Sequence, residues 1–522
     1  MKVLILVFSI FLYIGSAAAQ KRIFLGLCDT FPPNFYEKDI DTLLIENGMG
    51  YCVSPFKQLD ERIQNFHHLT YFYLRVSPTD FEEHDANYGA LPEEIGLCNQ
   101  LKNVSTNTLN EAVLHLKNLE VLDLVVADFN AVFLLQAIGL GDLSKLEVLN
   151  LNFQCALPPD FSIKGLEELP NLRSVRIAKP NQAVIDALLM NANLTSFAVT
   201  QSANLTYNFS SIEQIEEISI THSDLKNIPA SIYTCENLTH LNMSWNQINE
   251  IDSRIGELSK LEYLDLGSNE LKSISSEIGL CQALQMLNLS RNGGLGSVPA
   301  ALGQLHELTL LGLANCNLAE LPSSIAKCEK LEILSVDHNQ LVEIELDFSG
   351  LKELKGCNLS YNLLSGLPPS LFGCSKLENL DISYNKIEYL TDSIGALTAL
   401  KQLNAHENEL RALPEDIGEL QALVRLSLYE NQITYLPTSI IHLSNLEDLY
   451  VGNNQLTTFP PGMNKLHNLQ TLELQANPLL TFPTAIYKLT KLDRIWVSAA
   501  YSQLKGFKLL KKNPWVIVVD AV

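Results

Sequence analysis

Residues 400–422 read LKQLNAHENELRALPEDIGELQA, and this stretch decides the fold because much of the chain repeats it. With Leu400 as position 1, apolar residues occupy positions 1, 4, 6, 11, 14, 18 and 21, and Asn408 occupies position 9. The pattern starts again, at steps of 23 residues with a single step of 24, at Leu238, Leu261, Leu284, Leu308, Leu331, Leu354, Leu377, Leu423, Leu446, Leu469 and Leu492. A fixed period of this length predicts a solenoid of stacked repeats.

The first eight residues of each repeat alternate as in a strand, with positions 1, 4 and 6 pointing inward. Because every repeat runs the same way, the strands are expected to pair in parallel. Asn at position 9 can donate and accept hydrogen bonds where the chain turns inward. The asparagines at position 9, interrupted by Cys316, are Asn246, Asn269, Asn292, Asn339, Asn362, Asn385, Asn408, Asn431, Asn454 and Asn477.

Three repeats show the pattern clearly: LEYLDLGSNEL (261–271), LENLDISYNKI (377–387) and LEDLYVGNNQL (446–456). They resemble the motif L-x-x-L-x-L-x-x-N-x-L of the leucine-rich repeat family. The resemblance implies a curved α/β solenoid, a horseshoe with a parallel β-sheet on its concave face, closed by N- and C-terminal caps. In this family the position-9 asparagines form a buried ladder. The outer segments, such as LPEDIGEL (413–420), look like those of bacterial and plant repeat proteins.

The sequence predicts five segments along the chain. They are a signal peptide (1–19), an N-terminal cap (20–68), irregular repeats (69–237), regular 23-residue repeats (238–499) and a C-terminal cap (500–522). Lys2, an apolar run and the small residues up to Ala19 have the layout of a secretory signal. We therefore expect a secreted, periplasmic or cell-surface protein, with no transmembrane segment because the apolar run is too short.

Helices are expected at five places before the regular repeats. Within the N-terminal cap the pattern indicates a strand near Ile23–Leu27 and helical pieces around Lys38–Glu46 and Lys57–Asn65. The longer repeats Leu119–Lys145 and Leu146–Asn171 have room for an outer helix, and residues 182–193 have helical spacing.

Composition narrows the classes of partner and cofactor. The formal net charge of −23 argues against nucleic acid or an anionic membrane as the main partner. His338 and His406 lie three repeats apart, about 14 Å by strand spacing, which is too far for one metal ion. The sequence therefore predicts no metal and no cofactor.

The chain has ten cysteines, and their positions are more typical of packing in the core than of catalysis or metal binding. Five of them share one slot, three residues before a position-1 leucine, as core thiols would: Cys98, Cys235, Cys281, Cys328 and Cys374. Cys28 and Cys52 lie in the predicted N-terminal cap. In an oxidising compartment these two can form a disulfide, and two buried thiols are the alternative.

The predicted binding residues follow one another on neighbouring strands. They are His338, Tyr361 and Tyr384 at position 8, His406 and Tyr429 at position 7, and Glu407 and Glu430 at position 8. Exposed aromatic residues are enriched at binding hot spots, and the acids favour a basic partner. Trp245 and Trp496 lie away from this row, and for them a binding role and an ordinary surface position are equally well supported.

We therefore expect a non-catalytic protein that binds a protein partner through its concave face. A glycan-binding surface is the alternative, since aromatic rings can stack on sugars. A glycosidase is the third candidate, because Glu407 and Glu430 on adjacent strands would lie about 5 Å apart. Two solvated acids on an open sheet explain the same pair.

Overall fold

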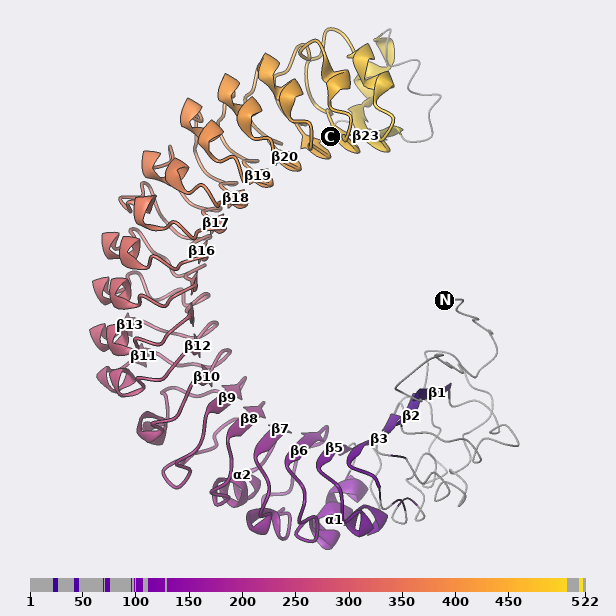
Figure 1. Cartoon of the computed structure of the whole chain (residues 1–522), viewed down its shortest axis with the longest axis vertical. Helices are drawn as coiled ribbons and strands as arrows, with labels where there is room; N and C mark the ends of the chain where they lie inside the picture. The colour runs from indigo at the N-terminus through magenta and orange to yellow at the C-terminus, as the bar shows by residue number, and fades with distance from the viewer. Residues whose placement is uncertain are drawn as a thin grey trace. The chain divides into compact units, whose positions relative to one another are not determined.

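Figure 1 shows the computed structural model of the chain. It describes residues 101–106, 111–126 and 129–504, single residues between 69 and 100, and the strands at 22–26, 42–46, 71–75 and 516–519. The predicted signal peptide, Cys28 and Cys52 lie outside the described residues. The chain divides into two compact parts, Met1–Met243 and Ser244–Val522.

In the first part, parallel strands pair in chain order. They are β1 (Arg22–Gly26), β2 (Thr42–Glu46), β3 (Tyr71–Arg75), β4 (Asn103–Thr106), β5 (Val121–Val126), β6 (Val148–Phe153), β7 (Ser174–Ala178), β8 (Ser196–Thr200), β9 (Glu217–Thr221) and β10 (His240–Asn242). The ladder thus reaches into residues 20–68. The helix predicted around Lys38–Glu46 is wrong, because the apolar run TLLIE pairs as strand β2.

Three outer helices were predicted for the repeats of the first part, and two of them are present. Helices α1 (Phe129–Ile138) and α2 (Gln182–Leu189) lie where they were expected. The helix expected within 146–171 is absent from these residues, which hold one 3-10 turn, η6 (Leu166–Glu168). Pro158 and Pro159 explain this, since a proline disfavours helical geometry in the residue before it. Among the described residues of this part, the other 3-10 helices are η5 (Glu111–His115) and η7 (Ala230–Thr234).

The second part carries the regular repeats, mostly with strands of three residues. Its main strands pair in parallel: β12 (Tyr263–Asp265), β14 (Met286–Asn288), β15 (Leu310–Gly312), β16 (Ile333–Ser335), β17 (Gly356–Asn358), β18 (Asn379–Asp381), β19 (Gln402–Asn404), β20 (Arg425–Ser427), β21 (Asp448–Tyr450), β22 (Thr471–Glu473), β23 (Arg494–Ser498) and β24 (Val516–Val519). A separate pair consists of β11 (Glu250–Ile251) and β13 (Ser273–Ile274).

The returning half of each repeat forms a single turn of 3-10 helix. These are η8 (Ser253–Glu257), η9 (Ser276–Leu280), η10 (Ala300–Gln304), η11 (Ser323–Lys327), η12 (Phe348–Gly350), η13 (Pro369–Gly373), η14 (Asp392–Ala396), η15 (Glu415–Glu419), η16 (Thr438–His442), η17 (Met463–Lys465), η18 (Thr484–Lys488) and η19 (Ala499–Gln503). Within this part the strands line the inner, concave side of the arc and the 3-10 turns its outer side (Figure 1).

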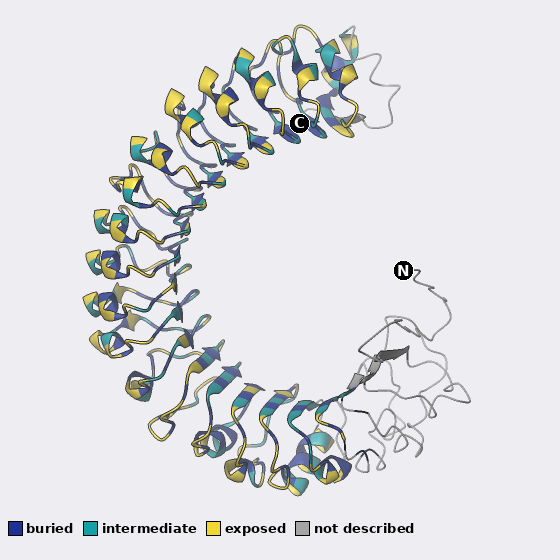
Figure 2. Cartoon of the chain, in the orientation of Figure 1, coloured by how far each residue is buried: buried dark blue, intermediate teal, exposed yellow. Residues whose placement is uncertain are grey.

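The core of each regular repeat consists of the residues at the recurring apolar positions. Leu400, Leu403, Ala405 and Leu410 are at most 1 % exposed, and the same positions are buried in neighbouring repeats. Figure 2 shows buried residues along the strands and exposed ones on the outer turns. Burying an aliphatic side chain contributes about 1.5–3 kcal/mol. Stacking of repeats therefore supplies the stabilisation that one repeat lacks.

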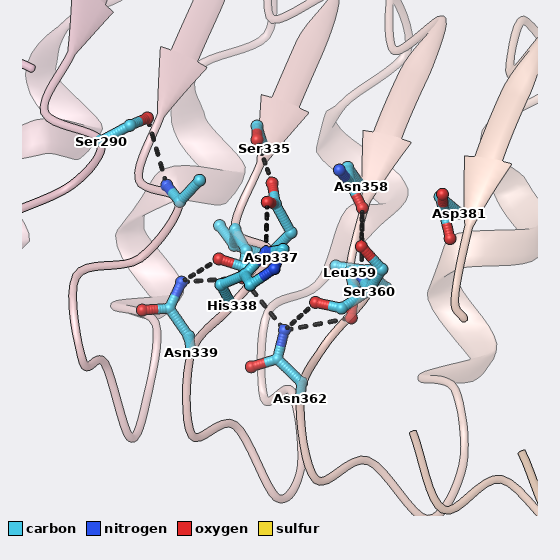
Figure 3. Close-up of polar contacts among 12 residues, drawn as sticks. Ser290, Ser335, Asp337, His338, Asn339, Asn358, Leu359, Ser360, Asn362 and Asp381 are labelled. Carbon is cyan, nitrogen blue, oxygen red and sulfur yellow. Dashed lines mark hydrogen bonds and ion pairs between the residues drawn. The ribbon is translucent and has the colours of Figure 1, made fainter. Parts of the chain in front are cut away.

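The asparagine ladder joins each repeat to the one before it. Asn385 accepts a hydrogen bond from Leu364 N–H at 3.0 Å and donates to the Leu359 carbonyl at 3.0 Å. Figure 3 shows the bonds that Asn339 and Asn362 donate. At the break in the ladder, the Cys316 thiol donates to the Leu289 carbonyl at 3.1 Å. The ladder therefore supplies polar partners to buried backbone groups.

Position 8 of each regular repeat adopts left-handed backbone geometry. From Trp245 to Ala476, the eleven residues at this position have φ between 51° and 61°. The extended strand predicted over eight residues is accordingly shorter, because the chain turns sharply before the asparagine at position 9. Non-glycine residues pay a conformational cost there, which the backbone bonds to the next repeat offset. Tyr361 N–H, for example, donates to the Ser383 carbonyl at 2.9 Å.

Two glycines in equivalent 3-10 turns offer a matched test of how tightly the outer turns pack. A Cβ on Gly303 would lie 2.3 Å from the Ser324 carbonyl oxygen, whereas a Cβ on Gly373 would meet nothing within 4 Å. We expect Gly303→Ala to lower the free energy of unfolding by about 1–3 kcal/mol through overpacking. Gly373→Ala should leave it unchanged or raise it by up to about 1 kcal/mol. Urea denaturation measures both; equal effects would contradict the packing described.

Candidate functional site

Three aromatic rings on the concave rim of the second part form a continuous stack. The rings of His338 and Tyr361 lie 4.1 Å apart at an interplanar angle of 15°, and those of Tyr361 and Tyr384 lie 3.9 Å apart at 13°. Tyr361 is 41 % exposed, His338 is exposed and Tyr384 is half-buried. We call these three residues the aromatic stack. The repeat register places them one strand spacing apart, which allows ring-on-ring contact.

The stack hides ring faces and presents ring edges. Tyr361 lies between two parallel rings, so both of its faces are covered. The hydrogen bond with Tyr361, together with partial burial and the nearby Glu407 carboxyl, raises the pKa of the Tyr384 hydroxyl to about 12. The surface offered to a partner therefore consists of ring edges and hydroxyl groups.

The remaining predicted residues continue the row beyond the stack. His406 meets Tyr384 edge to face, with centroids 4.9 Å apart at 82°. The Tyr429 hydroxyl accepts a hydrogen bond from Asn453 Nδ2 at 2.8 Å, and the same nitrogen donates to Glu430 Oε1 at 3.0 Å. Burial raises the pKa of Tyr429 to about 12 and lowers that of His406.

Glu407 and Glu430 hydrogen-bond to each other through their carboxyl groups. This bond is the main reason why the pKa of Glu407 is raised and that of Glu430 is lowered. Two carboxyl groups can share such a bond only when one of them holds a proton. A retaining glycosidase holds its carboxyl groups about 5–5.5 Å apart with the sugar between them. Direct contact leaves no such space, so this geometry does not favour the glycosidase alternative.

The shared bond predicts a pH-dependent effect of Glu407→Gln. The raised pKa means that ionising Glu407 destabilises the fold, so the wild type loses stability as pH rises through that pKa. Glutamine keeps a donor for Glu430 and cannot ionise. We expect the variant to match the wild type near about pH 4 and to be more stable at about pH 8.

Denaturation midpoints measured across this pH range check the effect. Glu409→Gln is the control, because the Glu409 side chain makes no hydrogen bond or ion pair among the described residues. A difference between Glu407→Gln and the wild type that does not change with pH would contradict the shared bond.

A groove runs across the concave face beside the aromatic stack. Its volume is about 570 Å³, and residues of strands β16 to β21 line it. Gly356, at position 3 of its repeat, leaves part of the floor without a side chain. Figure 3 shows Ser335, Asn358 and Asp381 at the ends of neighbouring strands in this region.

The polar groups of the groove are held in fixed positions. Asp381 Oδ1 accepts from Ser383 N at 3.0 Å and from Ser383 Oγ at 2.6 Å, while Oδ2 accepts from Asn404 Nδ2 at 2.9 Å. Arg425 donates to Asp448 Oδ2 through Nε at 3.1 Å and Nη2 at 3.0 Å. The Arg425 charge is thus compensated within the protein, whereas Asp381 is in no ion pair among the described residues.

The structure brings together the predicted residues from His338 to Glu430 and leaves the two tryptophans apart from them. The Trp245 ring lies 5.8 Å from the Arg291 guanidinium, an arrangement that permits a cation–π contact. Trp496 is half-buried on β23. Sequence reasoning missed the groove, although Gly356 at an outward-facing strand position was the available signal.

Thiols and metal ligands add no second site within the described residues. Apart from Cys98, the described cysteines are free thiols, and burial raises the pKa of Cys281 to about 12. Its thiol donates to the Ile255 carbonyl of the preceding repeat at 3.2 Å, which is a packing role. No group of three or more potential metal-ligating side chains occurs in the part of the chain that is described.

The sequence of these repeats matches models of known protein families. The sequence model described as "Leucine rich repeat" matches residues 259–318 and 329–387, and that described as "Leucine-rich repeat region" matches residues 362–511. The chain is a leucine-rich repeat protein. The fold predicted from the repeat pattern is thereby confirmed.

Solved structures of other leucine-rich repeat proteins share the fold. A leucine-rich repeat protein of Leptospira interrogans is 25 % identical, covers 73 % of this chain and 91 % of its own, and has a TM-score of 0.61. A plant peptide hormone receptor in complex with RGF2 is 21 % identical over 92 % of this chain and 87 % of its own (TM-score 0.54). A TLR13–ssRNA13 complex is 21 % identical over 93 % and 89 % (TM-score 0.56).

A search of the curated proteins finds no match to the sequence. Among the described residues, no helix has both the length and the apolar character needed to cross a membrane.

Proposed function

We propose that this leucine-rich repeat protein binds a protein partner on the concave side of the repeats that start at Leu331, Leu354, Leu377, Leu400 and Leu423. The observation that carries the proposal is the aromatic stack, a partly exposed row of three rings beside a groove. Aromatic side chains supply a large contact area at low conformational cost, and binding hot spots are enriched in them. Solenoids commonly use their concave surfaces for binding.

Charge favours a basic partner. The whole chain carries a formal charge of −23, and Asp381, Glu407 and Glu430 lie on or beside the proposed surface. Complementary charge increases the rate of association and disfavours acidic partners such as nucleic acids. The plant receptor and the TLR13 complex share the fold only, so their ligands do not identify the partner of this chain.

The glycan alternative is weaker on geometric grounds. A sugar ring packs on the face of an aromatic ring, and both faces of Tyr361 are already covered. The exposed edges of the aromatic stack suit side chains and peptide groups better.

Crosslinking from the stack tests the proposal. A photoreactive benzoylphenylalanine replaces Tyr361 in one variant and Tyr389, which is 67 % exposed at position 13, in the control. The native culture fluid or envelope fraction is then irradiated with each variant. We expect a discrete protein adduct from position 361 and not from position 389. Equal labelling from both positions, or a glycan adduct alone, would overturn the proposal.

Export is part of the proposed function. Residues 1–19 have the charged, apolar and small-residue layout of a signal peptide, which favours action outside the cytoplasm. We expect N-terminal sequencing of the exported protein to begin at Gln20 or a near neighbour. Recovery of the folded protein from the cytoplasm with Met1 intact would contradict export.

A further inference from the structure

In the groove beside the aromatic stack, Gly356 leaves an opening that the packing of the neighbouring strands does not require. Gly356 lies between Ile333 and Asn379 in the sheet register. A Cβ on Gly356 would meet only the Ile333 side chain, at 3.8 and 4.0 Å, which is ordinary contact. A larger residue would therefore fit on the backbone at this position and project into the groove. The glycine keeps space open and does not serve a close approach of two backbones.

The groove offers one uncompensated charge next to this opening. Asp381 lies on β18, the strand paired with the one that carries Gly356, and its carboxylate is fixed by three hydrogen bonds from Ser383 and Asn404. A carboxylate has room for about four hydrogen bonds, so one acceptor position on Oδ2 remains. The groove's own cation, Arg425, is already bonded to Asp448. The position therefore suits a cationic group supplied by a ligand.

Side-chain amides in the groove match a peptide backbone. Asn379 and Gln402 line the groove and make no side-chain hydrogen bond among the described residues. The amide of Asn358 uses its oxygen to accept from Ser360 N–H at 3.1 Å, and no bond from its nitrogen is found within the described part. Such groups can donate to and accept from the N–H and C=O groups of an extended chain.

The span of the groove sets the length of the occupant. It crosses the six strands β16 to β21, that is, five strand spacings of about 4.8 Å or about 24 Å. An extended chain covers that distance with about seven residues at about 3.3 Å each.

We infer that the groove holds an extended basic segment of a protein partner, with one lysine or arginine side chain seated over Gly356 against Asp381. The inference rests on the proposed function and adds the chemistry of the part of the partner that enters the groove. The aromatic stack then contacts the flank of this segment. The remaining acceptor position of Asp381 receives the cationic group.

The test uses a phage-displayed library of random nonapeptides, selected on the folded full-length protein. We expect the selected peptides to share a lysine or arginine at one position. Synthetic versions should bind Asp381→Asn about tenfold or more weakly, because asparagine keeps the shape and removes the charge. Gly356→Trp should abolish binding by filling the opening, whereas Gly356→Ala, which adds one methyl group, should retain it.

A double-mutant cycle tests whether Asp381 itself contacts the basic side chain of the peptide. If Asp381 holds the basic side chain, replacing that side chain by norleucine and replacing Asp381 by asparagine should together cost no more than either change alone. Asp416→Asn, an exposed acid in the outer 3-10 turn η15, is the charge control and should bind like the wild type. Circular dichroism checks that each variant is folded.

Three outcomes would overturn the inference: no basic preference among selected peptides, binding unaffected by Gly356→Trp, or additive effects in the cycle. Its failure is distinguishable from failure of the proposed function. A partner that crosslinks at position 361 and binds Gly356→Trp normally would leave the proposed function intact and remove only the basic segment from the groove.

Discussion

Replacing Asn385 by alanine is expected to lower the free energy of unfolding by about 3 kcal/mol. The substitution leaves the Leu364 N–H without its hydrogen-bond partner and removes one of the two side-chain bonds that the Leu359 carbonyl accepts, the other coming from Asn362. A buried group left unpaired costs about 1–3 kcal/mol, and the lost bond to Leu359 adds to this cost. Asn385 is 8 % exposed and belongs to an inner repeat, so water and the ends of the array are poorly placed to compensate.

Chemical denaturation of the purified protein measures this change. Asn379→Ala is the matched control, because Asn379 belongs to the same repeat, is exposed and makes no side-chain hydrogen bond among the described residues. We expect its midpoint to change little. If Asn385→Ala and Asn379→Ala have the same effect, the ladder does not carry the stabilisation assigned to it.

The repeat pattern was sufficient to predict the fold, because stacking depends on spacing more than on any single residue. A leucine every 23 residues fixes which side chains are buried, and parallel pairing follows from the common direction of the repeats. The asparagine ladder was also predictable, since position 9 carries a residue whose side chain can both donate and accept. Asn385 and Asn408 both make the expected bonds.

Local backbone geometry was harder to predict, because tertiary contacts determine it. The alternating pattern suggested longer strands, whereas position 8 turns into the left-handed region even when it carries tyrosine. The run Thr42–Glu46 had an ambiguous period and forms a strand in the ladder. Within 146–171, Pro158 and Pro159 outweighed the available length. In each case a local restriction or a neighbouring strand decided the outcome.

The candidate site was predictable in position and not in detail. The register alone places His338, Tyr361 and Tyr384 on neighbouring repeats, so their proximity could be expected. Their parallel stacking depends on side-chain rotamers, which a sequence pattern does not contain. The groove beside Gly356 results from a missing side chain, and Asp381 gains its importance only from the hydrogen bonds around it.

Removing the two tyrosines of the aromatic stack is expected to weaken binding of the protein partner strongly. Tyr361→Ala combined with Tyr384→Ala deletes two of three stacked rings and leaves the buried core unchanged. Each hot-spot aromatic contributes about 2 kcal/mol or more, and neighbours are not additive, so we expect a loss of about 2–4 kcal/mol. That corresponds to a roughly 30- to 1,000-fold higher Kd.

The most direct test of partner binding at the concave face is the Kd of this double variant for the crosslinked partner, measured by titration calorimetry. The control is Tyr389→Ala with Tyr435→Ala, two exposed tyrosines at position 13 that lie outside the stack. Circular dichroism and denaturation midpoints establish that both variants are folded. The structure predicts a large loss of affinity for the stack variant and none for the control. An unchanged Kd in the folded stack variant would contradict the concave site.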